Sequence, residues 1–188
     1  MTGSTKDRLA AAAAQLLDRG GQEAVTLRAV AEKVGVSHNA PYKHFRDRSA
    51  LLAGVARRDF EELNRVFADA LNEEPDGASA LRRALKAFVD YGLAHPSRYR
   101  LLFSDPDLQA DDDFKEAATG PFKIIVQIVS RCQSGGVLPM GDPVRLSGLI
   151  FAAAHGAIDL EIGGRASDKK GLRSVMGTMN LLLKLMAP

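Results

Sequence analysis

The stretch TLRAVAEKVGVSHNAPYKHFRDRSALL, residues 26–52, decides the fold expected for the N-terminal part of this 188-residue chain. Thr26 is a suitable N-cap, and the apolar residues after it recur at helical spacing as far as Val34. Gly35 fits the position just beyond a helix, where φ is positive. A second, very short helix is expected over residues 37–45, with a serine at its start. The spacing therefore predicts two helices joined by a tight turn.

Two helices with a tight turn form a helix-turn-helix, whose second helix enters the DNA major groove. The side chains suit this task, because Asn39 can contact adenine in a bidentate manner and Lys43 can reach guanine or phosphate. Hydroxyl groups and helix N-termini hold phosphate anions. The predicted DNA-binding residues are Thr26, Arg28, Ser37, His38, Asn39, Tyr42, Lys43, His44 and Arg48.

Pro41 lies in the middle of the expected second helix. On a wheel of about 100° per residue it shares one side with Phe45, whereas Asn39 and Lys43 lie about 160° away from it. We therefore expect Pro41 and Phe45 to face the protein and the polar residues to face outward. The proline removes one helical hydrogen bond, but it fixes φ in a helix too short to be stable alone.

The charge distribution supports a polyanion-binding N-terminal part. The whole chain has a net charge of only +2. Between Thr26 and Arg58, however, seven basic side chains stand against two acidic ones, and two histidines are present in addition. The segment SDPDLQADDDF, residues 104–114, is acidic instead. Such asymmetry is a modest indication of nucleic-acid binding, and a solvated helical surface would also explain it.

Helical spacing continues through the rest of the chain, and no alternating β pattern of useful length occurs. The predicted fold is all-α with about nine helices, a three-helix DNA-binding domain at 1–48 and a larger ligand-binding and dimerisation domain at 49–188. Gly120 and Pro121 are expected to bend one long helix. Outside the opening stretch, helices are predicted at residues 9–20, 47–72, 81–95, 99–103, 113–133, 143–163 and 168–186.

Composition excludes several classes of protein. No run of about 18 apolar residues appears, so we expect no membrane span and a cytoplasmic location. Cys132 is the single cysteine, which rules out an intramolecular disulfide and a zinc site built on several thiolates. We expect no cofactor, no metal and no enzymatic activity, since no nucleophile, zinc or phosphate-loop motif is present.

The stretch over residues 26–52 resembles the tetracycline-repressor (TetR) family of transcriptional regulators. It contains the threonine, the Gly-Val-Ser turn, the Tyr-x-His-Phe run and the Leu-Leu pair at matching spacing. The resemblance implies a homodimer that binds a near-palindromic DNA operator and acts as a repressor. It also implies a small-molecule effector bound in the C-terminal domain. The segment FAAAHGAIDLEIGGR, residues 151–165, is similar to a subgroup with Trp, His and Gly in this helix, but Phe151 stands where the tryptophan would be.

The C-terminal part offers candidates for an effector cavity and for a dimer interface. Small residues in the helix at 143–163 and apolar residues in the last helix suit packing against a second copy, so we expect dimerisation through the last two helices. The candidate ligand-binding residues, which helical spacing also allows as ordinary core, are Tyr91, His95, Tyr99, Phe103, Phe122, Phe151 and His155.

Two alternatives remain open from the sequence. One keeps the DNA-binding part but gives the rest only an oligomerisation role, without an effector. The other is a small helical enzyme that uses His155 and Asp159, one helical turn apart. Such a histidine is more often a packing or ligand-contact residue, and one pair supplies too few ligands for a closed metal site.

Overall fold

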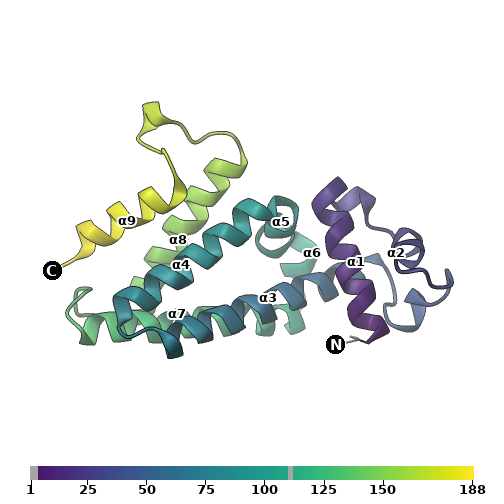
Figure 1. Ribbon diagram of the computed structural model, residues 1–188, viewed down its shortest axis with the longest axis horizontal. Coiled ribbons are helices and arrows are strands. Elements are labelled where there is room, and N and C mark those ends of the chain that lie inside the picture. Colours follow the sequence, from purple (N-terminus) through teal and green to yellow (C-terminus); the bar gives the residue numbers. More distant parts are fainter. Residues whose placement is uncertain (1–3, 110–111) are drawn as a thin grey trace. The chain divides into compact units, whose positions relative to one another are not determined.

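The computed structural model describes residues 4–109 and 112–188. These residues are helical or irregular, with no β-strand among them, as the periodicity predicts (Figure 1). Three short 3₁₀ segments lie between α-helices of the described part of the chain: η1 (Gln22–Ala24), η2 (Pro41–Lys43) and η3 (Asp168–Lys170). The α-helices are α1 (Thr5–Gly20), α2 (Leu27–Val34), α3 (Arg48–Glu73), α4 (Gly77–Ala94), α5 (Pro96–Ser104), α6 (Pro106–Gln109), α7 (Asp112–Ser134), α8 (Pro143–Ile162) and α9 (Val175–Met186).

The chain divides into two compact units. The first comprises Met1–Glu61 and His95–Ala118, and the second comprises Glu62–Ala94 and Thr119–Pro188. Two of the three boundaries, after Glu61 and after Ala118, fall inside the helices α3 and α7, and the third separates α4 from α5. The functional boundary expected between residues 48 and 49 stays a prediction.

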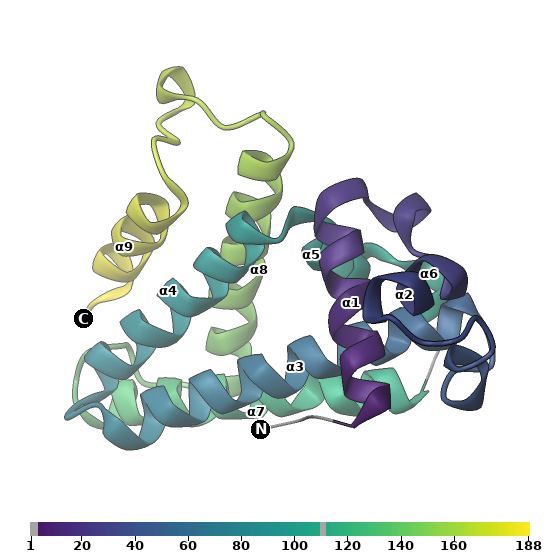
Figure 2. The ribbon, with the colours of Figure 1, turned by 45° about the vertical axis from the view of Figure 1, so that its right-hand side comes forward.

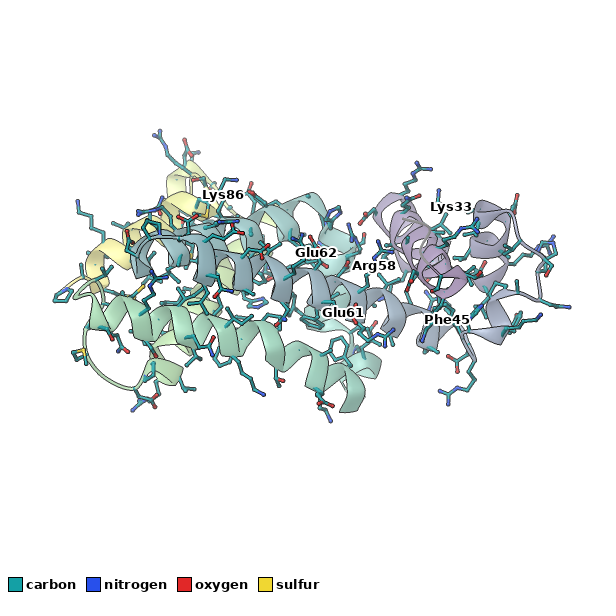
Figure 3. All side chains as sticks on the ribbon, turned by 60° about the horizontal axis from the view of Figure 1, so that its bottom comes forward. Lys33, Phe45, Arg58, Glu61, Glu62 and Lys86 are labelled. Atoms are coloured by element: carbon teal, nitrogen blue, oxygen red, sulfur yellow. The ribbon has the colours of Figure 1, made fainter. Side chains whose placement is uncertain are left out.

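In the first unit, α1 packs against α2 and α5. A capping box starts α1, in which the Ser4 hydroxyl accepts from the Asp7 amide and the Asp7 carboxylate accepts from the Ser4 amide. Arg58 of α3, labelled in Figure 3, donates from Nη1 to the Asp7 carbonyl oxygen at 3.2 Å. The ring of Phe60 meets those of Phe103 and Phe114 edge to face, with centroids 5.8 and 5.3 Å apart. Aromatic packing and polar ties therefore hold α1, α3 and α5 together.

In the second unit, α4 packs against α8, and α9 contacts both of them (Figure 2). Arg131 of α7 closes the C-terminal end of α3. Its guanidinium donates to the carbonyl oxygens of Leu71, Glu74 and Pro75 at 2.9, 3.1 and 2.7 Å. Helix ends leave carbonyl groups without helical partners, and this half-buried arginine fork satisfies several such groups at once.

The structure differs from the sequence-based expectation at the second helix of the helix-turn-helix and at the start of the last helix. The expected helix over residues 37–45 is a turn followed by η2, for a reason given below. The last helix, expected from residue 168, begins at Val175, because Ser174 caps it by accepting from the Gly177 amide.

The expected bend site in α7 stays helical through Pro121. The acidic segment 104–114 lies partly outside the described residues, and α6 occupies part of it.

Gly77 permits the close approach of α4 and α7. A Cβ at this position would lie 2.6 Å from the backbone nitrogen of Cys132 and 2.9 Å from its Cα. Backbone atoms of a packed helix cannot give way cheaply, so we expect Gly77→Ala to lower the free energy of unfolding by about 1–3 kcal/mol. Urea denaturation measures this loss, with Gly148→Ala as control, since a Cβ at Gly148 meets nothing within 4 Å. Equal effects of the two substitutions would contradict the prediction.

Candidate nucleic-acid interface

Residues 37–44, here called the reading segment, form a tight 3₁₀-like coil between α2 and α3. The Ser37 carbonyl accepts from the Ala40 amide at 2.9 Å, and the Pro41 carbonyl accepts from the His44 amide at 2.9 Å. An α-helix would need the residue 41 amide to donate to the Ser37 carbonyl, and proline has no N–H. The chain therefore closes three-residue turns in place of the expected α-helix.

The reading segment presents its polar side chains to solvent, in the orientation that the helical wheel predicts. Pro41 is buried and Phe45 is only 3% exposed. The side chain of Tyr42 is 59% exposed although it is aromatic. The other exposed residues of the segment are Ser37, His38, Asn39, Lys43 and His44. Groups that can donate to or accept from base edges and phosphates are thus gathered on one short piece of backbone.

Phe45 anchors the reading segment to the rest of the first unit. Its backbone amide donates to the Pro41 carbonyl at 2.9 Å, and the Lys6 ammonium of α1 lies 5.9 Å from its ring centroid. A Cβ at Gly54 of α3 would lie only 2.8 Å from the Phe45 ring. Gly54 therefore provides the space for this ring, a role that the sequence analysis missed. A glycine inside the apolar stripe of a long helix was the available signal.

The N-terminus of α2 is a second exposed polar feature. Thr26 caps it as predicted, with Oγ1 accepting from the Ala29 amide at 3.0 Å. Thr26 and Arg28 are both exposed, and the first turn of α2 contains no acidic residue. The positive end of the helix dipole is therefore not offset locally and can attract a phosphate. Gly35 ends α2 in the left-handed conformation, at φ 75°, as the sequence predicts.

Arg48 differs from the other predicted DNA-binding residues. Its side chain is half-buried, and its guanidinium is directed into the protein. Nε donates to the Val25 carbonyl at 2.9 Å, and Nη2 donates to the Gln22 carbonyl.

The structure brings three of the candidate ligand-binding residues together in the second unit. The His155 ring lies 4.0 Å from that of Phe151, and the Phe151 ring lies 5.8 Å from that of Phe122. Phe88, which the sequence analysis did not select, joins this group at 5.1 Å from His155. Burial among these rings lowers the pKa of His155 to about 4, so its imidazole is neutral near pH 7. Tyr91 is half-buried in the same unit.

The other three candidates belong to the first unit. Tyr99 is buried beside Phe103, with ring centroids 5.0 Å apart. His95 Nδ1 lies 3.0 Å from a carboxylate oxygen of Asp18. The His95 contact joins the start of α5 to α1, and the ring contact lies within α5.

His155 and Asp159, the two residues of the enzyme alternative, have different surroundings. Asp159 is exposed and forms an ion pair with Arg165, while His155 lies among aromatic rings. Within residues 4–109 and 112–188, no group of three His, Cys, Asp or Glu side chains could hold a metal ion. Nor does any helix in the described part of the chain have the length and hydropathy needed to cross a membrane.

Two protein-family models match the chain. Residues 9–55 match the model described as bacterial regulatory proteins, tetR family, and residues 81–173 match the tetracyclin repressor-like C-terminal domain. The chain belongs to the TetR family. The first match contains the reading segment with its anchor Phe45, and the second contains the aromatic group around His155. Membership of the Trp-His-Gly subgroup stays a prediction.

The proteins that resemble this chain include two described as HTH-type transcriptional regulators. The chain is 31% identical over 97 residues to the uncharacterised HTH-type transcriptional regulator YobS of Bacillus subtilis, covering 52% of this chain and 50% of that protein. It is 34% identical over 98 residues to the HTH-type transcriptional activator FasR of Mycolicibacterium smegmatis, covering 52% and 44%. The matched region thus spans half or less of these relatives. A structure from Rhodococcus sp. RHA1, of unknown function, covers 100% of this chain and 97% of that one at 29% identity, with a TM-score of 0.80.

Proposed function

We propose that this TetR-family protein is a DNA-binding transcriptional regulator that reads its operator with residues 37–44. The observation that carries the proposal is the separation of roles within that segment: Pro41 and Phe45 are buried against the protein, while the polar side chains are exposed. The N-terminus of α2 adds a phosphate-binding position beside it. The side chains proposed to face DNA are Thr26, Arg28, Ser37, His38, Asn39, Tyr42, Lys43 and His44.

The protein acts as a homodimer through α8 and α9 in this proposal. Large apolar side chains of these helices are exposed in the single chain, including Leu149 at 53%, Leu181 at 58% and Leu185 at 76%. Apolar surface of this kind gains free energy when a second copy covers it. Two reading segments would then meet half-sites about 34–36 Å apart, or somewhat more, on a near-palindromic operator.

A small, largely apolar effector in the second unit would regulate DNA binding. The rings of Phe88, Phe122 and Phe151 around the neutral imidazole of His155 support this part of the proposal. An effector that binds better to the dimer geometry with the wrong half-site separation would release the operator. A regulator without an effector is the second candidate, favoured by the aromatic packing itself, because such rings also form an ordinary core.

We propose repression as the direction of regulation, in a cytoplasmic protein without catalytic activity. Binding of a dimer across a promoter excludes other proteins from it. FasR is an activator, so the direction is tested by a reporter gene placed behind the selected operator. Lower reporter output in the presence of the protein supports repression, and higher output contradicts it.

Selection of bound sequences from random double-stranded DNA tests the DNA-binding function. We expect an enriched sequence with two inverted half-sites. Binding should weaken steeply as salt concentration rises, because phosphate contacts release counterions. Enrichment of no sequence, together with salt-insensitive or absent binding, would contradict the proposed function.

We expect Asn39→Ala to weaken binding to the selected operator about 10- to 100-fold, since a bidentate base contact discriminates by about 1–3 kcal/mol. Lys43→Ala should weaken operator binding as well. The matched control is Lys86→Ala in α4, an exposed lysine paired with Asp90 (labelled in Figure 3). Fluorescence anisotropy with labelled operator measures all three. Wild-type affinity in both Asn39→Ala and Lys43→Ala would contradict the assignment of this face.

A further inference from the structure

We infer that Arg48 is a positioning residue of the DNA-reading element, and that its side chain holds protein carbonyl groups in place of a DNA phosphate. This inference rests on the proposed function. Arg48 is the first residue of α3, and the reading segment ends four residues before it. From this position its guanidinium donates to the carbonyl oxygens of Val25 and Gln22, at the other end of the helix-turn-helix.

The two accepting carbonyls lie in the segment that precedes α2. Gln22 begins η1, and Val25 precedes the cap Thr26. Arg48 therefore ties the start of α3 to the start of α2. The chain between these two points contains α2, the turn at Gly35 and the whole reading segment. A clamp across both ends of this stretch fixes the position of the Thr26 hydroxyl relative to the reading side chains.

The neighbouring side chain on the same stretch has a contrasting environment. Arg46 has a side chain that is 87% exposed, and its Nε pairs with the adjacent carboxylate of Asp47 at 2.8 Å. Arg48 is half-buried, with two N–H groups already occupied by the protein. A phosphate contact through Nε would require its bond to the Val25 carbonyl to be broken or shared, so a phosphate would have to bind other N–H groups of the guanidinium. The Arg46 bond, by contrast, joins two exposed side chains and is screened by water.

The clamp needs arginine, not only a positive charge. The guanidinium is a planar fork that presents Nε and Nη2 to two acceptors in fixed directions. A lysine ammonium is a single point donor on a flexible chain, so it cannot satisfy both carbonyls with the same geometry. A phosphate contact, by contrast, depends mainly on charge and tolerates lysine better. The two roles therefore respond differently to the same substitution.

The experiment compares Arg48→Lys and Arg48→Met with Arg46→Lys as the matched control. Each full-length variant is titrated against the operator selected by the wild-type protein and against a scrambled duplex of equal length, at several salt concentrations. We expect Arg48→Lys to lose about 10- to 100-fold of its operator affinity, as hydrogen bonds to a charged group are lost. Its affinity for the scrambled duplex and its salt dependence should match those of the wild type. The Arg46→Lys control should match the wild type in all three measurements.

Two results in this titration would overturn the inference. Wild-type operator affinity in Arg48→Lys, with a salt slope reduced by about 0.9 in Arg48→Met, would identify a phosphate contact. An equal loss on operator and scrambled duplex would indicate a general loss of folded protein, without a positioning role.

Hydrogen exchange separates failure of this inference from failure of the proposed function. The Ala29 amide donates to the Thr26 hydroxyl, so we expect it to exchange faster in Arg48→Lys than in the wild type or in Arg46→Lys. If the wild-type protein selects no DNA sequence, the proposed function fails. In that case faster Ala29 exchange in Arg48→Lys still supports the clamp, and unchanged exchange overturns it.

Discussion

Replacing Arg98 with methionine is expected to lower the free energy of unfolding by about 3–5 kcal/mol, the cost of removing one partner from a buried ion pair. Arg98 of α5 has a side chain that is 14% exposed, and its Nη1 lies 2.9 Å from a carboxylate oxygen of Asp59 in α3. The Asp59 side chain is 8% exposed. Arg98 Nε also donates to the Asp18 carboxylate of α1 at 3.0 Å. One guanidinium therefore joins three helices of the first unit.

Arg83 provides the control for Arg98. It also pairs with two carboxylates, those of Glu73 and Glu74, but its side chain is 39% exposed. Water and salt screen exposed ion pairs, so Arg83→Met should lower the free energy of unfolding far less than Arg98→Met does. Guanidinium chloride denaturation of both variants measures the difference. Equal losses would show that burial of the Arg98 network does not determine its contribution.

A double substitution tests the cause of the loss in Arg98→Met. If the loss comes from the buried charge of Asp59, adding Asp59→Asn to Arg98→Met should restore part of the stability, because it removes that charge. A double variant less stable than Arg98→Met would place the cause elsewhere, in packing of the methylene groups of Arg98.

Acidification is expected to destabilise the protein through His155. Its pKa is lowered in the folded state to about 4, against an ordinary value of 6.5, by burial. Between these two pH values the unfolded chain binds a proton at this residue that the folded protein does not bind. The contribution is therefore fully present above pH 6.5 and is lost as pH falls toward 4. The full loss is on the order of 3 kcal/mol.

Comparison with His155→Gln isolates this contribution. Unfolding free energies of the two proteins are measured at pH 7.5 and at pH 5 in the same buffer system. The other titrating groups are common to both, so the difference between the two pH dependences reports on His155. We expect the wild type to lose more stability than His155→Gln on acidification. Parallel pH dependences would show that the imidazole is not buried as the structure has it.

The pattern of local signals was sufficient for most of the secondary structure. Thr26 and Gly35 predicted the two ends of α2, and the structure has caps at these positions. Such ends depend on hydrogen bonds between near neighbours, which a sequence displays directly. The start of the last helix was predicted too early: Asp168 begins the short 3₁₀ segment η3, and Ser174 is the residue that caps α9.

The orientation of the reading segment was also predictable, although its exact coil was not. An angle of about 100° per residue already separates Pro41 and Phe45 from Asn39 and Lys43. The missing N–H of Pro41 then decides between an α-helical and a 3₁₀ turn, and it does so together with the burial of Phe45 against Gly54. Aromatic spacing did not reveal that His95, Tyr99 and Phe103 belong to the first unit, and the ligand-binding role of these residues stays a prediction.

The sequence by itself determined that this protein is helical, that residues 26–45 form a helix-turn-helix and which of its side chains face outward. Only the tertiary structure decided what the buried charges do. Arg48 and Arg98 look like surface arginines in the sequence, yet each meets partners 23 or more residues away. Spacing in a sequence reports contacts within a helix or a turn. A fork of N–H groups finds its acceptors only after distant helices have packed around it.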